Sequence, residues 1–157
     1  MSGSEGIRAA LPGDMPALMA ALKALARDLD DPFRMAPATL GAALFDPCPR
    51  AFALLAGEEG AVLAQPNVST SLGGTVTFVS DLWVSEDARG TGLGRRLLAR
   101  AAQEGAARWQ AVALRLTVYE DNSGARAFYD RLGFAVRAAD RNALLQGAAL
   151  ARLMEHA

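Results

Sequence analysis

Leucines recur through the first part of the chain at the spacing of one helical face. In the segment "PGDMPALMAALKALARDL" (residues 12–29) they are Leu18, Leu22, Leu25 and Leu29. Asp14 precedes this stripe at the position of an N-cap, so the pattern predicts a helix whose leucine face packs into the core. A second, short helix is predicted from about Pro37, and it must stop at "DPCP" (residues 46–49) because proline cannot continue a helix.

After these helices the pattern changes to short apolar runs separated by turn residues. Strands are predicted for residues 7–11, 51–57, 61–68, 75–84, 111–118, 134–137 and 143–145. The runs at 51–57, 61–68 and 75–84 are joined by "EEG" and by a turn with Gly73 and Gly74, which is typical of an antiparallel meander. The sheet is therefore expected to be at least partly antiparallel.

Helical spacing returns twice in the second half of the chain. One helix follows the glycines at 90–94 and is expected to turn these residues inward: Leu93, Leu97, Leu98, Ala101 and Ala102. Another is predicted for "NSGARAFYDRL" (residues 122–132), with Asn122 as its N-cap and Gly133 as its C′ residue. A last helical piece begins near Ala148.

Length and composition favour one compact domain over residues 1–157. The chain is 52% hydrophobic and its net charge is only −1, so it lacks the broad basic surface that nucleic-acid binding needs. Cys48 is the one cysteine, and the first six residues lack the pattern of a signal peptide. Charged residues break every long apolar stretch, so no membrane segment is expected, and a cytoplasmic location is the default.

Three glycines at alternate positions, Gly90, Gly92 and Gly94, stand between a predicted strand and a predicted helix. Such a turn presents backbone N–H groups and the positive end of the helix dipole to an anion, and Arg89 and Arg95 add positive charge. A tight turn without a ligand has the same spacing. The stretch fits neither the P-loop nor the dinucleotide fingerprint, because it lacks the required Lys-Ser/Thr or third glycine.

The stretch resembles the acetyl-CoA loop of the GCN5-related N-acetyltransferase (GNAT) superfamily, whose Arg/Gln-x-x-Gly-x-Gly/Ala pattern is met by Arg89, Gly92 and Gly94. The preceding strand "DLWV" also matches. A second motif, "NSGARAFYDRLGF" (residues 122–134), is similar to the family's Asn-x-x-Ala-x-x-Phe-Tyr signature. "QPNVSTSLGG" before "TVTFVSDLWV" resembles the diamine acetyltransferase-like branch. The resemblance implies an α/β (α+β) GNAT fold with a mixed, mostly antiparallel central sheet of about six or seven strands flanked by helices.

The resemblance also implies an acetyl-CoA-dependent N-acetyltransferase that acts on a primary amine of a small molecule, by direct attack in a ternary complex. Acetyl-CoA is then a co-substrate, and its pantetheine and pyrophosphate are expected on these residues: Leu82, Trp83, Val84, Arg89, Gly90, Thr91, Gly92, Leu93, Gly94, Arg95, Asn122 and Ala125. Asn122 and Tyr129 lie about two helical turns apart and can address one ligand. By resemblance, Asn122 contacts the cofactor and Tyr129 is the general acid near the sulfur.

The base is the point where the sequence departs from the family pattern. Diamine acetyltransferase-like members read Glu-Asp where this chain has Ser80-Asp81. Strand alternation places Asp81 on the face opposite Ser80, Leu82 and Val84. Three roles stay open for Asp81: catalytic base, substrate anchor or solvent-facing residue. Glu120 and Asp121 are further candidates for the base, acting through a water molecule. The working mechanism is a deprotonation of the amine that is relayed by water.

Two other readings of the chain stay open. One is a domain that binds acetyl-CoA without catalysis, which the serine at position 80 encourages; the other is a nucleotide-binding regulatory domain that shares only the glycine turn. No spacing of His, Cys, Asp and Glu suggests a metal site. The resemblance makes a homodimer a reasonable expectation. The acceptor has no readable signature, because diamines, polyamines, lysine-like amino acids, aminoglycosides and protein N-termini all present amines.

Overall fold

The computed structural model describes residues 6–137 and 143–155. The chain divides into two compact units, Met1–Thr117 and Val118–Ala157, which are described separately below. The first unit holds the whole sheet and most of the core. The expectation of a single domain over residues 1–157 stays a prediction.

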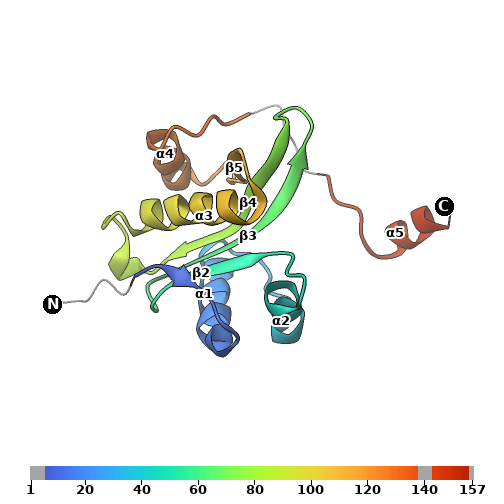
Figure 1. Ribbon diagram of the computed structural model, residues 1–157, viewed down its shortest axis with the longest axis horizontal. Helices are drawn as coiled ribbons and strands as arrows, with labels where there is room; N and C mark the ends of the chain where they lie inside the picture. The colour runs from blue at the N-terminus through green and yellow to red at the C-terminus, as the bar shows by residue number, and fades with distance from the viewer. Residues whose placement is uncertain (1–5, 138–142, 156–157) are drawn as a thin grey trace. The chain divides into compact units, whose positions relative to one another are not determined.

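The first unit is a five-stranded mixed sheet with helices on both faces (Figure 1). Its elements are β1 (Arg8–Ala9), η1 (Pro12–Asp14), α1 (Met15–Asp28), α2 (Pro37–Phe45), β2 (Phe52–Ala56), β3 (Gly60–Ser69), β4 (Gly74–Val84), η2 (Glu86–Ala88), α3 (Leu93–Trp109) and β5 (Ala113–Leu116). The strands lie in the order β1-β2-β3-β4-β5. The first four pair antiparallel, which confirms the meander, and β5 adds parallel to β4.

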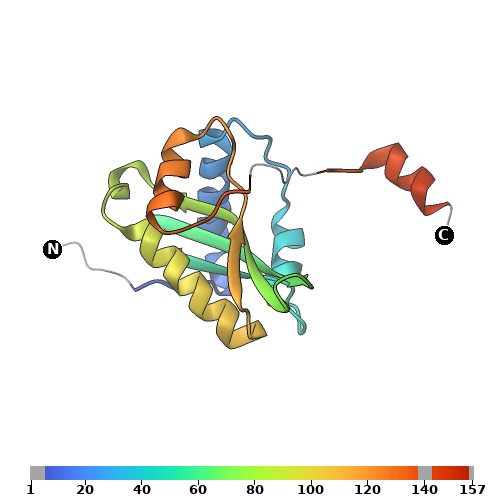
Figure 2. The same cartoon turned by 90° about the horizontal axis from the view of Figure 1, so that it is seen from above.

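The two faces of the sheet are covered by different helices. α1 and α2 lie on one face and α3 on the other (Figures 1 and 2). On the first face, Leu18 and Leu22 of α1 pack with Leu55 of β2 and Leu63 of β3 in one buried cluster. The first half of the predicted leucine stripe is therefore on the core face of α1. Leu25 and Leu29 are only half-buried, and Leu29 follows the last residue of the helix.

Helix α3 packs very closely on β4. Leu93, Leu97, Leu98 and Ala101 are buried as predicted, whereas Ala102 is exposed, and that part of the prediction was wrong. The buried stripe continues instead at Gly105, where a Cβ would lie only 1.7 Å from Oγ1 of Thr77. Because the helix follows a period of 3.6 residues, position 105 faces the sheet and position 102 does not. The missing side chain lets the helix backbone approach the strand.

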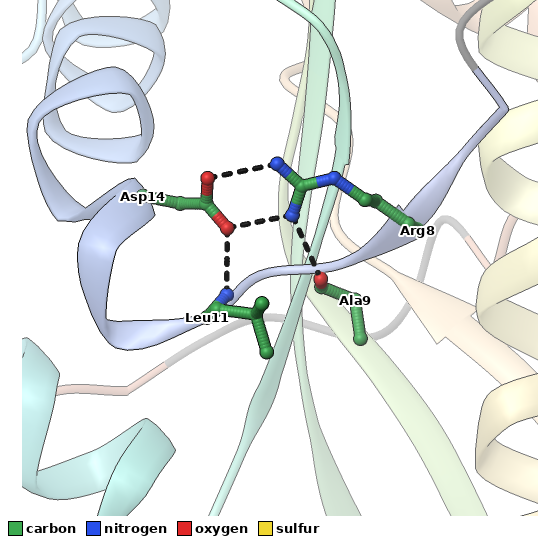
Figure 3. A network of polar contacts seen from close by, with 4 residues as sticks. All are labelled: Arg8, Ala9, Leu11 and Asp14. Atoms are coloured by element: carbon green, nitrogen blue, oxygen red, sulfur yellow. Dashed lines mark hydrogen bonds and ion pairs between the residues drawn. The ribbon is translucent and has the colours of Figure 1, made fainter.

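Asp14 is the N-cap residue of α1, as predicted, but its side chain makes no capping bond to that helix (Figure 3). Its carboxylate instead accepts two bonds from the Arg8 guanidinium, at 2.6 and 2.8 Å, and one from the N–H of Leu11 at 2.7 Å. These bonds favour the charged form and hold the pKa of Asp14 well below its usual value. The competing partner, Arg8 on β1, explains the difference.

The second unit contains α4 (Ser123–Arg131) and α5 (Gly147–Met154), so both predicted helices are confirmed. Residues 134–137 and 143–145, which were expected as strands, form none. The sheet therefore has five strands in the described part of the chain instead of about six or seven. Short apolar runs do not by themselves specify a strand, because a strand also needs a neighbour to pair with, and Leu144 is 82% exposed.

Candidate active site

A β-bulge in β4 determines which face of the sheet Asp81, the candidate base, occupies. Leu63 of β3 pairs with Asp81, but the next residue, Ala64, pairs with Val79, so Ser80 is the extra residue. Its hydroxyl donates to the carbonyl oxygen of Leu63 at 3.3 Å. One extra residue reverses which face the following side chains occupy. Asp81 therefore shares a face with Leu63, the face covered by α1 and α2, whereas Val79 lies on the α3 face.

Asp81 is half-buried in this position, which favours the base or substrate-anchor role over a solvent-facing one. Burial raises the pKa of its carboxyl above the usual value, and the neighbouring Ser80 side chain opposes this in part. Glu120 and Asp121, the other acids considered, are both exposed. A carboxylate with a raised pKa is better matched to accepting a proton near neutral pH than an ordinary surface aspartate.

The same end of β4 has a free edge. β5 pairs with Val76 to Val79 only, and beyond this point no described strand lies against β4 on that side. Backbone N–H and C=O groups of the segment Leu82–Val84 can therefore pair with an extended ligand that carries amides, in the way an added strand does. This arrangement supports the expectation that the segment holds pantetheine. Trp83 points instead into the face covered by α1 and α2 and packs against its core cluster.

The glycine turn leads directly from β4 and η2 into α3. Gly90 and Gly92 have φ values of +77° and +81°, which side chains rarely allow. A Cβ at Gly90 would meet no atom within 4 Å, so the turn needs glycine there for its backbone conformation. Gly94 already lies inside the helix.

Helix α3 begins with Gly92 as N-cap, and no side chain caps it in the part of the chain that the structure describes. The N–H groups of Leu93, Gly94 and Arg95 have no acceptors within the helix because they belong to its first turn. Together with the positive end of the dipole, these groups form a binding place for an anion such as a pyrophosphate.

The side chains of the glycine turn mostly form hydrogen bonds within the turn and to the elements beside it. Thr91 donates its hydroxyl to the carbonyl oxygen of Ala88 at 2.7 Å, and Arg96 donates to the carbonyl oxygen of Thr91 at 3.3 Å. Arg89 donates from Nε to the carbonyl oxygen of Val84 and forms an ion pair with Asp28. Arg96 and Asp28 were not among the residues predicted from the sequence. Nothing in their local pattern marks them, because their roles depend on contacts made by the fold.

The second unit holds the other predicted site residues on α4. Asn122 is the N-cap, as predicted: its Oδ1 accepts from the N–H of Ala125 at 3.1 Å. This bond uses the amide oxygen and not the amide N–H₂, which can donate to a ligand. At the other end, Gly133 has a φ of +91° and ends the helix as its C′ residue, as predicted. Both ends of this helix are thus fixed by local side-chain and backbone bonds.

Tyr129 is held by the turn that ends α4. Its carbonyl oxygen accepts from the N–H of Phe134 at 3.1 Å, and the two rings lie edge to face with centroids 5.5 Å apart. Phe128 contacts the phenol ring from the helix side. Burial raises the pKa of Tyr129 above its usual value, so the phenol keeps its proton at neutral pH and can donate a hydrogen bond.

The first unit thus brings together Asp81, the free edge of β4 and the glycine turn, and the second unit carries Asn122, Ala125 and Tyr129 on one helix. In the residues that the structure covers, no group of three or more His, Cys, Asp and Glu could hold a metal ion. No helix among them has the length and apolar character to cross a membrane.

Comparisons with solved structures match the fold over most of the chain. An integron cassette protein from the mobile metagenome of V. cholerae superposes with a TM-score of 0.74 at 18% identity, over 98% of this chain and 99% of that one. A point mutant of the BH1408 protein from Bacillus halodurans gives 0.69 at 24% identity, over 90% and 99%. An aminoglycoside acetyltransferase from an uncultured soil metagenomic sample gives 0.72 at 12% identity, over 90% and 96%. At these identities the likeness concerns the fold.

A comparison with curated proteins finds no match. The family model described as "Acetyltransferase (GNAT) family" matches residues 18–134, a span that includes the β4 bulge, the glycine turn and α4. The match covers well over half of the chain and crosses both units. This chain therefore belongs to the GNAT acetyltransferase family.

Proposed function

We propose that this protein is an acetyl-CoA-dependent N-acetyltransferase that acetylates a primary amine of a small molecule by direct attack in a ternary complex. The observation that carries the proposal is the bulge at Ser80, which turns a half-buried aspartate to one face of β4 at the end where that strand has a free edge. Family membership supports acetyl-CoA as the acyl donor. Diamines, polyamines and amino acids are the acceptor classes proposed.

The chain offers complementary groups for the pyrophosphate and the pantetheine of acetyl-CoA. The N–H groups from Gly90 to Arg95 would bind the pyrophosphate at the start of α3. The free edge at Leu82–Val84 would pair with the pantetheine amides. Asn122, whose amide oxygen caps α4, would donate a further hydrogen bond from its N–H₂ to the cofactor. Most of the binding then comes from the backbone.

The reaction needs an amine without its proton. An alkyl amine with a pKa of ~10.4 is neutral in only about one molecule in a few thousand at neutral pH. Asp81 accepts this proton, directly or through water, and the amine nitrogen attacks the thioester carbonyl carbon. The C–N bond forms, the C–S bond breaks, and the electron pair of the C–S bond leaves on sulfur. The second proton, which the nitrogen loses as it becomes an amide, passes through water to the thiolate, so that free CoA leaves as the thiol.

Tyr129 is proposed to stabilise the departing thiolate. A phenol with its usual pKa of ~10 is a weaker acid than a thiol at ~8.5, and the raised pKa of Tyr129 widens this gap. Full proton transfer from the phenol to the sulfur is therefore unfavourable in free energy. A hydrogen bond from the phenol to the developing negative charge is the larger part of the role.

Replacing Tyr129 with phenylalanine separates an enzyme from a protein that only binds acetyl-CoA. We expect kcat to fall about 10²-fold, the effect of removing one donor to a developing charge, while the Kd for CoA changes little. Steady-state kinetics and calorimetry measure the two quantities. Tyr119→Phe, at the other tyrosine of the chain, removes an equivalent hydroxyl from an exposed side chain and is the matched control. Loss of turnover with intact binding excludes the binding-only reading, and equal kcat values for the two variants would remove Tyr129 from the mechanism.

Replacing Gly92 with alanine tests the glycine turn. The left-handed conformation costs an L-residue about 1–2 kcal/mol, so the turn should reorganise and the Kd for CoA should rise about tenfold. Gly41→Ala in α2 is the control, because its added Cβ makes an ordinary contact of 3.6 Å with Met15. A Kd that stays at the wild-type value in Gly92→Ala would exclude this turn as the phosphate site.

Three finer points are part of the proposal. A neighbour in fold is an aminoglycoside acetyltransferase, so aminoglycosides belong in the substrate screen beside diamines and amino acids. A homodimer is proposed from the family resemblance, and size-exclusion chromatography with light scattering measures the oligomeric state.

A cytoplasmic location is proposed because the sequence has a single cysteine. Fractionation of cells that express the chain tests this location.

A further inference from the structure

One ion pair joins distant parts of the first unit. Arg89, which precedes the glycine turn, places Nη2 2.7 Å from Oδ2 of Asp28, the last residue of α1. The two residues are 61 positions apart, whereas the other ion pairs found among the described residues, such as Arg100 with Glu104, are local. The pair therefore connects the end of α1 to the turn that starts α3.

The same guanidinium makes a second contact. Its Nε donates to the carbonyl oxygen of Val84, the last residue of β4, at 3.2 Å. A planar guanidinium that bonds in two directions at once has a fixed orientation. Arg89 therefore links three elements, α1, β4 and the glycine turn, at the place where the pyrophosphate is expected.

Asp28 is poorly placed to stabilise its own helix. A carboxylate in the last turn lies beside the negative end of the helix dipole, which disfavours it, whereas a cation there is favourable. Arg89 supplies this cation. The position of Asp28 is therefore explained by its contact with Arg89 better than by any benefit to α1.

We propose that Asp28 is a positioning residue for the phosphate-binding turn. It holds Arg89 in the orientation that keeps the turn in its anion-binding conformation. Arg89 then acts mainly as a support of the turn and not as a direct phosphate ligand. This inference rests on the proposed function, because it assumes that CoA binds at this turn.

The test compares Asp28→Asn with Asp30→Asn by calorimetric titration with CoA. Both changes remove one negative charge from the same region, but Asp30 makes no ion pair in the described part of the chain, and its φ of +57° suits asparagine. We expect the Kd for CoA to rise about 2- to 5-fold in Asp28→Asn, the range for a partly exposed pair, and to stay unchanged in Asp30→Asn. Both Tm values and kcat at saturating acetyl-CoA should match the wild type.

A double variant shows whether Asp28 acts through Arg89. Arg89→Gln should weaken CoA binding more than Asp28→Asn, because it also loses the bond to Val84, and adding Asp28→Asn should then have no further effect. The difference between Asp28→Asn and wild type should also shrink in about 1 M salt, where charges are screened within about 3 Å.

Three results would overturn the inference: equal Kd values for the Asp28 and Asp30 variants, additive losses in the double variant, or tighter CoA binding in Asp28→Asn. Tighter binding would mean that Asp28 competes with phosphate for Arg89. If the wild-type protein itself fails to bind CoA, the proposed function is contradicted instead.

Discussion

Asp81→Asn is expected to lower kcat/KM about 10²- to 10⁴-fold, the usual contribution of a positioned general base. The amide keeps the size of the side chain but cannot accept the amine proton. The measurement is initial rate of acetyl transfer at several amine concentrations. Asp87→Asn, in the 3₁₀ turn that follows β4, is the control because it removes an equally charged but exposed carboxylate.

The pH dependence of kcat/KM is an independent test of Asp81 as the base. Burial raises the pKa of Asp81, so its protonated, inactive form persists to a higher pH than in an ordinary aspartate. The acidic limb of kcat/KM should therefore inflect above the usual aspartate pKa of 3.8, with activity rising as pH increases. Asp81→Asn should lose this inflection. An unchanged profile in the variant would assign the base to water alone or to another acid.

Gly105→Ala is expected to have the largest effect on stability. The added Cβ would lie 1.7 Å from Oγ1 and 2.9 Å from Cβ of Thr77, a residue that is fully buried. Relieving this overlap requires α3 to move away from β4, which should cost about 3 kcal/mol or more and lower Tm by about 6–12 °C. Thermal unfolding followed by circular dichroism measures the change.

Two further variants separate this clash from a general effect of alanine. Gly124→Ala in α4 adds a Cβ in open space and should leave Tm unchanged or slightly higher, since alanine favours helix. In the double variant Gly105→Ala with Thr77→Ala, the loss should be smaller than the sum of the single losses, because the second change removes the closest contact. Strict additivity would contradict the packing account.

The elements that depend on local patterns could be predicted from the sequence. The leucine stripe of α1, the prolines after α2 and the caps of α4 act within a few residues, and each was confirmed. The final strands were wrongly predicted because residues 134–137 and 143–145 carry an apolar pattern but have no pairing partner in the described chain. Strand formation depends on that partner and not on the run itself.

The candidate site also has parts that the sequence predicts and parts that depend on the fold. The glycine turn was found from its spacing, but the reason for glycine at position 90 is a positive φ that only the backbone reveals. Simple alternation could not give the face of Asp81 relative to earlier β4 residues, because the bulge at Ser80 resets it. The partnership of Arg89 with Asp28 crosses 61 positions and has no sequence signal.

Acetyl transfer itself is tested most directly by measuring release of free CoA thiol from acetyl-CoA in the presence of pooled amines. The pool contains diamines, polyamines, amino acids and aminoglycosides, and the control omits the amines. We predict release that depends on the amine, is greatly reduced in Asp81→Asn, and is accompanied by an acetylated product. CoA binding without amine-dependent release from any part of the pool would contradict the proposed activity and favour a protein that binds acetyl-CoA without catalysis.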